Sequence, residues 1–315
     1  MTHSVLAAPP ALRTLVAGVV DYAGLFPPAA LDMATAVANY ATYRASDDAW
    51  MLGRFVVPVS RLDEWQAAVA ALPPAHREAW HGARVSALLS GEFSSEAARM
   101  AAFNADAPFG VRIDVAEGRT STPDSVLATA AAMPDNVTLY CELPHASDPL
   151  ALLQAVRSAH VRAKIRTGGV TPDAFPTPDE IVRFLRRCVE VGVTAKATAG
   201  LHHPLRGEFR LTYAPDAVRG VMYGYLNVFL AAAALSIGAD DAIARAILTE
   251  TRRESFVVRD DAVVYAPDGV ETVTLLQPSL ASMRAGGVVA FGSCSFREPV
   301  DELAELLSPG DSKRL

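Results

Sequence analysis

The sequence predicts an α/β protein with the (β/α)₈ TIM-barrel fold. Apolar runs bounded by Gly, Pro or Asp alternate with helical patterns along most of the chain, which is typical of a parallel sheet with helical crossovers. Eight strand patterns can be counted, and 315 residues suit one such barrel, so we expect a single domain over residues 1–315. An open doubly wound sheet remains an alternative, because periodicity does not show that strands close into a ring.

The eight predicted strands are short apolar runs. They cover residues 15–25, 51–60, 84–91, 108–117, 136–144, 161–169, 192–204 and 287–296. Seven of them precede a predicted helix. These helices cover residues 30–44, 63–72, 94–104, 123–133, 149–160, 178–191 and 299–307. The sequences TPDS, SDPL and TPDE support the phasing, because each places a capping side chain before a proline at the first helical position.

An insertion is expected between strands 7 and 8, because residues 207–284 are too many for one crossover helix. It contains an Ala-rich helix at 223–237, a second helix at 240–253, and a hairpin of residues 255–260 and 261–266 with a Pro-Asp-Gly turn. We consider the Ala-rich helix a candidate face for a homo-oligomer.

Composition restricts the class of partner. A net charge of −7 without a basic cluster argues against nucleic acid, and the longest apolar run, 226–239, is too short to cross a membrane. No signal-peptide pattern is present, and the three cysteines lack metal-ligand spacing. We therefore expect a cytoplasmic protein that acts on a small molecule, with no metal and no cofactor.

Polar residues interrupt four consecutive strands that should be apolar on both faces. Because side chains alternate along a strand, the polar set is predicted to face the barrel axis. It consists of Arg112 and Asp114, Tyr140 and Glu142, Lys164 and Arg166, and Lys196 and Thr198. In barrels of this kind the carboxyl ends of strands carry the chemistry. The alternative is an ion-pair network that only completes the core.

Two lysines stand out in this set. The chain has 25 arginines but only three lysines; Lys313 is near the end, and Lys164 and Lys196 occupy inward positions on adjacent strands. Arginine cannot replace a deprotonatable amine. Two neighbouring ammonium groups disfavour each other's charge, which should lower the pKa of at least one of them and favours a lysine nucleophile and Schiff-base chemistry.

The segments that carry these lysines resemble the class I deoxyribose-phosphate aldolase family. Lys164-Ile-Arg-Thr-Gly168 is similar to its Schiff-base strand, and Lys196-Ala-Thr-Ala-Gly200 to its second lysine strand. Two further segments, beginning at Val20 and Phe291, look like the family's opening strand and phosphate loop. The resemblance covers the barrel strands, about half of the chain.

The resemblance implies that Lys164 forms the imine, Lys196 lowers its pKa, and Asp114 shuttles protons. Gly200, Gly292 and Ser293 would then hold an anion. With Asp21 and Glu142 we count these lysines and Asp114 as catalytic candidates. The expected substrate-binding residues are Arg112, Arg166, Thr167, Thr198, Gly200, His202, His203, Gly292 and Ser293.

Departures from the family change the expected substrate. Arg166, the Leu201-His-His-Pro204 segment and the insertion have no family counterpart. The inward charges leave a small positive excess, so we expect an anionic carbonyl compound other than deoxyribose phosphate. Two alternatives stay open: a metal-assisted or cofactor-free hydrolase or isomerase that uses Glu142, His202 and Asp114, and a barrel that binds a ligand without catalysis.

Overall fold

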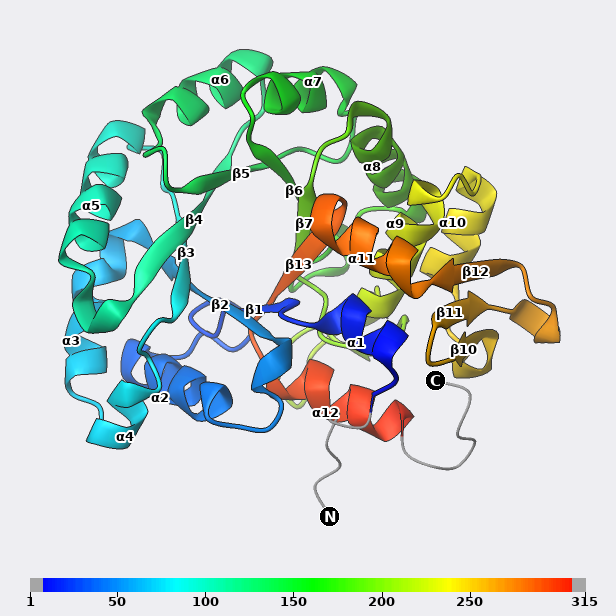
Figure 1. Ribbon diagram of the computed structural model, residues 1–315, viewed down its shortest axis with the longest axis horizontal. Coiled ribbons are helices and arrows are strands. Elements are labelled where there is room, and N and C mark those ends of the chain that lie inside the picture. Colours follow the sequence, from blue (N-terminus) through cyan, green and yellow to red (C-terminus); the bar gives the residue numbers. More distant parts are fainter. Residues whose placement is uncertain (1–7, 308–315) are drawn as a thin grey trace.

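The computed structural model describes residues 8–307, so Lys313 lies outside the described residues. Eight parallel strands close into a barrel in the order β1-β13-β7-β6-β5-β4-β3-β2, which confirms the predicted (β/α)₈ TIM-barrel fold (Figure 1). The strands are β1 (Val20–Tyr22), β2 (Leu52–Pro58), β3 (Arg84–Leu88), β4 (Arg112–Arg119), β5 (Thr138–Glu142), β6 (Arg162–Arg166), β7 (Ala195–Thr198) and β13 (Val288–Ser293).

Helices surround this barrel on the outside (Figure 1). They are α1 (Pro10–Val16), α2 (Met33–Arg44), α3 (Leu62–Ala70), α4 (Pro74–Glu78), α5 (Phe93–Asp106), α6 (Pro123–Ala132), α7 (Leu150–Ser158), α8 (Pro178–Val191) and α12 (Arg297–Leu306). Two of the three predicted caps are confirmed: Thr122 and Thr177 cap α6 and α8, each in a reciprocal capping box. Helix α7 begins one residue later than expected, with Pro149 in the cap position.

The first predicted strand is shorter than its apolar run. Leu15 and Val16 belong to α1, because Pro10 occupies the first position of that helix and starts it before the strand. Only Val20–Tyr22 pairs within the barrel, with β13 on one side and β2 on the other.

The core lies between the strands and the helices. Its largest side chains form an aromatic cluster in which Trp80 lies 4.7 Å from Tyr40 and 5.2 Å from both Phe55 and Trp65, measured between ring centroids. On β6 and β7, Ala163, Ile165, Ala195 and Ala197 are buried against the helices. The opposite faces of these strands therefore point to the barrel axis, as predicted.

The insertion between β7 and β13 contains more structure than its sequence pattern predicts. Its elements are β8 (Gly207–Arg210), β9 (Arg219–Met222), α9 (Tyr225–Ser236), α10 (Asp241–Thr249), β10 (Phe256–Val258), β11 (Ala262–Tyr265), β12 (Val273–Leu276) and α11 (Gln277–Gly286). The predicted hairpin is the β10–β11 pair, and the Pro-Asp-Gly turn follows it and leads to the unpredicted strand β12.

The Ala-rich helix α9 is not a surface for a second copy of the chain. Residues 225–235 are all buried, and the helix packs between α8, α10 and α11. Buried Asn227 joins it to α10, because its side-chain amide donates to the carbonyls of Ile247 and Glu250. The Ala residues thus allow close packing inside the chain, which removes the reason for proposing a dimer face here. No helix among residues 8–307 meets the length and apolarity needed to cross a membrane.

Candidate active site

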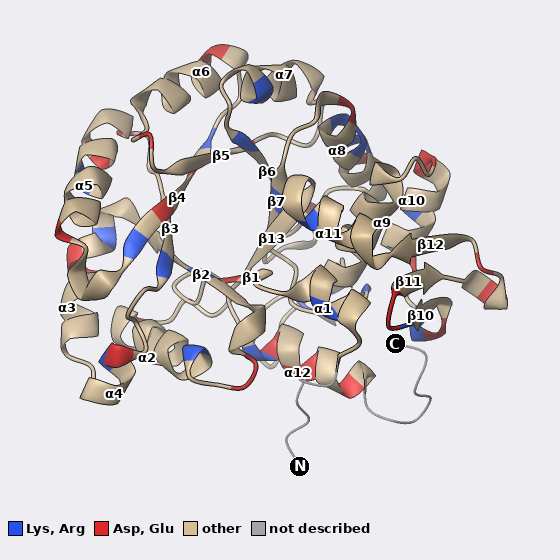
Figure 2. Ribbon diagram, viewed as in Figure 1, with Lys and Arg blue, Asp and Glu red and all other residues tan. Residues whose placement is uncertain are grey.

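A cavity of about 620 Å³ opens at the carboxyl ends of the barrel strands. One wall is charged and comes from β4, β5, β6 and β7. It consists of Glu117, Arg119, Glu142, Lys164, Arg166 and Lys196. The facing wall is mostly apolar, apart from Ser60 and Ser90, and comes from the segment after β1 and the ends of β2 and β3. It includes Phe26, Pro27, Pro28, Val56, Leu88, Leu89 and Phe93. Figure 2 shows acidic and basic segments along the barrel strands.

Lys164 and Lys196 lie side by side, because they are direct partners in the register between β6 and β7. Both are nearly inaccessible, with 4% and 2% of their surface exposed. Glu117 bridges them: its two carboxylate oxygens lie 2.7 Å from Lys164 Nζ and 2.7 Å from Lys196 Nζ. The predicted lysine pair is therefore brought together, with a carboxylate between the two ammonium groups.

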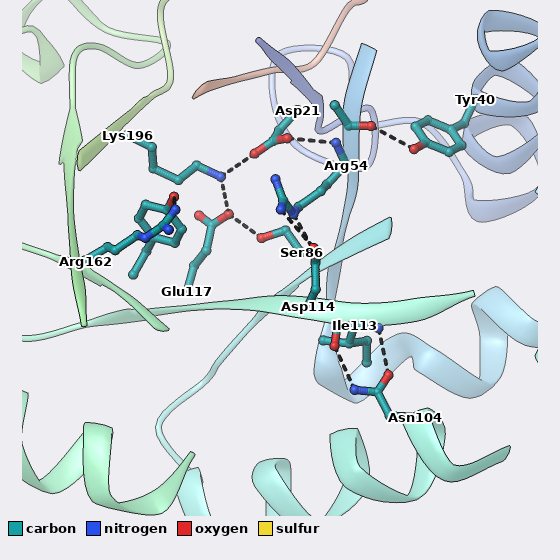
Figure 3. A network of polar contacts seen from close by, with 12 residues as sticks. Asp21, Tyr40, Arg54, Ser86, Asn104, Ile113, Asp114, Glu117, Arg162 and Lys196 are labelled. Carbon is teal, nitrogen blue, oxygen red and sulfur yellow. Dashed lines mark hydrogen bonds and ion pairs between the residues drawn. The ribbon is translucent and has the colours of Figure 1, made fainter. Parts of the chain in front are cut away.

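Each lysine has a second carboxylate partner. Lys196 Nζ donates to Asp21 at 2.6 Å, and the other oxygen of Asp21 accepts from the backbone N–H of Arg54 at 2.8 Å (Figure 3). Lys164 Nζ lies 2.8 Å from Glu142. Asp21 is buried below the cavity, whereas Glu142 lines it. Lys164 is thus held between two residues of the cavity wall, and Lys196 is anchored from beneath.

These contacts fix the charges of the site. Burial would raise the pKa of Glu117, but the two lysine ammonium groups outweigh burial and hold that pKa far below its usual range. Burial would lower the pKa of Lys196, yet Asp21 and Glu117 hold it well above its ordinary value. Lys196 is therefore not a lysine whose pKa is lowered by its neighbour, because the intervening carboxylates more than cancel the repulsion.

Glu142 completes the charged wall. Its pKa lies below the ordinary value: burial opposes the shift, and Lys164, Arg166 and Arg119 outweigh burial. Arg119, at the end of β4, donates to the second oxygen of Glu142 at 3.2 Å, and 81% of its side chain is exposed. Both carboxylates of the wall, Glu117 and Glu142, are thus held in the ionised form by their cationic neighbours.

Glu117 is the site residue that the sequence analysis missed. Strict alternation puts residue 117 on the same face as Val111, Ile113 and Val115, that is, under the helices. The register between β3 and β4 shifts after Ile113, so that Ser86 pairs with Val115 and Asp114 is the extra residue of a β-bulge. This bulge turns Glu117 to the barrel axis, where it also accepts a hydrogen bond from Ser86 Oγ (Figure 3).

Asp114 and Arg112 do not reach the cavity. Asp114 forms a bidentate ion pair with Arg54, with its two oxygens 2.8 and 2.9 Å from the guanidinium nitrogens. Neither Asp114 nor Arg54 lines the cavity. Arg112, at the start of β4, is exposed and donates to the carbonyl of Asn104. The carboxylate that β4 contributes to the cavity is thus Glu117, three residues after Asp114, which the family resemblance selects.

Only some of the predicted anion-binding residues line the cavity. Thr198, Gly200 and Gly292 line the cavity. Thr167 is buried and donates instead to the carbonyls of Thr198 and Ala199, which joins the ends of β6 and β7. Ser293 is buried outside the cavity lining, and its hydroxyl accepts from the backbone N–H of Ser295.

His202 and His203 point to different surroundings. His202 lines the cavity, with Nδ1 3.0 Å from Glu298 and 3.9 Å from the sulfur of Cys294. Burial would lower its pKa, but Cys294 and Glu298 together raise it to about 9. His203 lies outside the cavity lining, pairs with Glu302 at 2.7 Å and stacks on Phe209. Among residues 8–307, no group of three or more His, Cys, Asp or Glu residues is arranged to hold a metal ion.

The comparisons with known proteins assign no family to this chain. No family model matches the chain, and no curated protein matches it either. Among solved structures, the crystal structure of the Bacillus cereus spore cortex-lytic enzyme SleL is similar with a TM-score of 0.39 and 12% identity, over 92% of this chain and 73% of that one. A likeness at this level carries no inference, and the resemblance to the aldolase family rests on the sequence segments described above.

Proposed function

We propose that this chain is an enzyme of the lyase or aldolase type, which forms a Schiff base between Lys164 and a small anionic carbonyl compound. The observation that carries the proposal is the position of Lys164, whose Nζ reaches the cavity between Glu117 at 2.7 Å and Glu142 at 2.8 Å. An amine that faces a substrate-sized cavity, with proton acceptors on both sides, has what imine formation requires.

The first step can be written with these groups. Lys164 gives its proton to Glu142 or Glu117, and the free amine attacks the carbonyl carbon. The protonated carboxylic acid returns this proton to the oxygen, which becomes a hydroxyl. The same carboxylate then takes a second proton from the nitrogen and gives it to the hydroxyl, which leaves as water when the C=N bond forms. The protonated imine carries the same positive charge as the ammonium group, so the ion pair with Glu117 is restored once the imine has formed.

Lys196 has a supporting role in this proposal. Because Asp21 and Glu117 keep it charged, it remains an ammonium next to the reacting amine. A fixed positive charge beside Lys164 stabilises negative charge that develops on the substrate.

The hydrolase or isomerase alternative has less support. Of its three proposed residues, Glu142 and His202 line the cavity, but Asp114 is held by Arg54 away from it. A barrel that only binds a ligand would not need the amine of Lys164. The experiment below separates these alternatives from the proposal.

The test is reductive trapping. The protein is incubated with aldehydes and keto acids, reduced with borohydride, and mapped by peptide mass. We expect an adduct on Lys164 in the native chain and in Lys313→Met. We expect none in Lys164→Arg, which keeps the charge but cannot form an imine. An adduct that persists in Lys164→Arg, or that forms on no lysine of a folded protein, would contradict the proposal.

A further inference from the structure

Arg166 is the unsatisfied cation of the charged wall. It lies two residues after Lys164 on β6, so both side chains leave the same face of the strand. Its side chain is half-buried and lines the cavity, yet it makes no hydrogen bond or ion pair with any of residues 8–307. Other partly buried arginines of the barrel are paired: Arg54 with Asp114, and Arg162 with the hydroxyl of Tyr140.

The charges around the cavity also leave Arg166 without a paired carboxylate. Four cationic residues of β4, β6 and β7 line it, against the two carboxylates Glu117 and Glu142. Asp21 below the cavity neutralises one more charge through Lys196. One positive charge remains without a counterpart, and Arg166 is the member of the set that has no carboxylate within ion-pair distance among the described residues.

We propose that Arg166 binds the carboxylate of an α-keto acid whose neighbouring carbonyl reacts with Lys164. This inference rests on the proposed function and names its substrate class. Residues two apart on a strand are separated by about 7 Å, so the long side chains of Lys164 and Arg166 can converge on adjacent atoms of one small molecule. A guanidinium binds a planar carboxylate with two parallel hydrogen bonds, which fixes the orientation of the carbonyl next to it.

The facing wall defines the remainder of the substrate. Phe26, Val56, Leu88 and Phe93 make most of this wall apolar, with Ser60 and Ser90 as its polar side chains. A carboxylate and carbonyl at the charged wall leave the rest of a cavity of about 620 Å³ to be filled by hydrocarbon or an aromatic ring. Phenylpyruvate therefore fits this arrangement better than pyruvate does.

The experiment uses matched pairs of carbonyl compounds that differ in the carboxylate. Borohydride trapping on Lys164 is measured as a function of concentration for pyruvate against acetone and for phenylpyruvate against phenylacetone. We expect trapping on Lys164 to reach half of its maximum at a lower concentration of each keto acid than of the matching neutral ketone. Arg166→Gln should raise the half-saturating concentration of the keto acids roughly ten- to a hundredfold and change that of the neutral ketones much less.

Arg162→Gln is the matched control, since Arg162 lies two residues before Lys164 on the same strand but outside the cavity lining. It should bind the keto acids as the native chain does. Equal effects of the two substitutions, or an unchanged keto-acid response in Arg166→Gln, would overturn the inference. Tighter trapping of dihydroxyacetone phosphate than of phenylpyruvate would also overturn it, in favour of a phosphate.

A second measurement separates this inference from the proposed function. Phenyllactate carries the same carboxylate but no carbonyl, so its binding to the full chain, followed by calorimetry, does not depend on imine formation. Binding that is lost in Arg166→Gln and kept in Arg162→Gln supports the carboxylate site even if no lysine adduct forms. Imine trapping without any Arg166-dependent binding of phenyllactate supports the proposed function and refutes the carboxylate site.

Discussion

Glu117 joins the two lysines of the cavity through a single carboxylate. Its oxygens contact Lys164 and Lys196 separately, and Ser86 donates a further hydrogen bond. Buried ion pairs contribute little net stability when complete, but they become costly when one partner is lost. The same residue is therefore expected to matter for folding and for the charge state of both lysines.

The substitution Glu117→Gln keeps the shape and removes the charge. We expect it to lower the free energy of unfolding at neutral pH by about 3–5 kcal/mol, because two buried ammonium groups lose their common partner. It should also reduce imine trapping on Lys164 in the fraction that remains folded. Urea unfolding and reductive trapping measure the two effects.

Asp114→Asn is the comparison that tests the assignment. Asp114 is the acid that the family resemblance selects, but its contact is with Arg54 outside the cavity lining. The side chains of that pair are about 30% exposed, so we expect a loss of roughly 1 kcal/mol at most and unchanged trapping. Loss of trapping in Asp114→Asn, with Glu117→Gln fully active, would contradict the site described above.

Strand β4 shows which parts of the fold and of the site can be predicted from the sequence and which cannot. The closed order of strands follows from alternating strand and helix patterns, because parallel strands need helical crossovers. The inward positions of Lys164, Lys196 and Glu142 follow from the period of two along regular strands. A bulge adds one residue and reverses that period, and no local sequence signal on β4 marks it, so strict alternation does not find Glu117 among the inward residues.

The insertion was harder to predict for a related reason. Helix α9 is apolar all round, and the pattern alone does not say whether its partners belong to the same chain or to a second copy. Its burial against α8, α10 and α11 depends on tertiary contacts that its own composition does not specify. The same holds for Arg166, whose lack of a partner is visible only when all its neighbours are placed.

The close approach of β2 to β1 gives a prediction at this scale. A Cβ atom at Gly53 would lie 2.4 Å from Oδ1 of Asp21 and 3.1 Å from the carbonyl oxygen of Val20. Asp21 cannot yield freely, because it holds both Lys196 and the backbone of Arg54. Gly53→Ala is therefore expected to destabilise the protein by about 1–3 kcal/mol, measured by thermal or urea unfolding.

Gly286→Ala serves as its control. A Cβ atom at Gly286, in α11, meets nothing within 4 Å. This substitution should leave stability unchanged or raise it by up to about 1 kcal/mol, since alanine loses less conformational entropy on folding. Similar destabilisation by both substitutions would mean that the contact with Asp21 is not the cause.

For the whole molecule, the ionisable groups of the cavity predict how stability depends on pH. Glu117 and Glu142 have pKa values below the ordinary 4.5. Below pH 4.5 these two carboxylates bind protons in the unfolded chain while they remain ionised in the folded chain. The free energy of unfolding should therefore fall as the pH drops below about 4.5. This acid limb should be shallower in Glu117→Gln, in unfolding curves recorded at a series of pH values.

The raised pKa of His202 predicts how the free energy of unfolding changes at alkaline pH. Its pKa is raised from 6.5 to about 9, so between these values the folded chain keeps a proton that the unfolded chain has released. The stabilising contribution is complete below pH 6.5 and is lost as the pH rises to about 9, with a total of roughly 3 kcal/mol. The slope should disappear in His202→Asn; a slope that survives there would assign it to another group.

The scarcity of lysine makes the chemistry of this chain observable by a direct route. Reductive methylation with isotopically labelled formaldehyde adds methyl groups to amines, and the sequence offers only three lysines to label. Two of them are the neighbours in the cavity, in different surroundings and with different carboxylate partners. Their methyl resonances would be separate and nearly free of background, so nuclear magnetic resonance could follow the proton on each amine while a ligand is added.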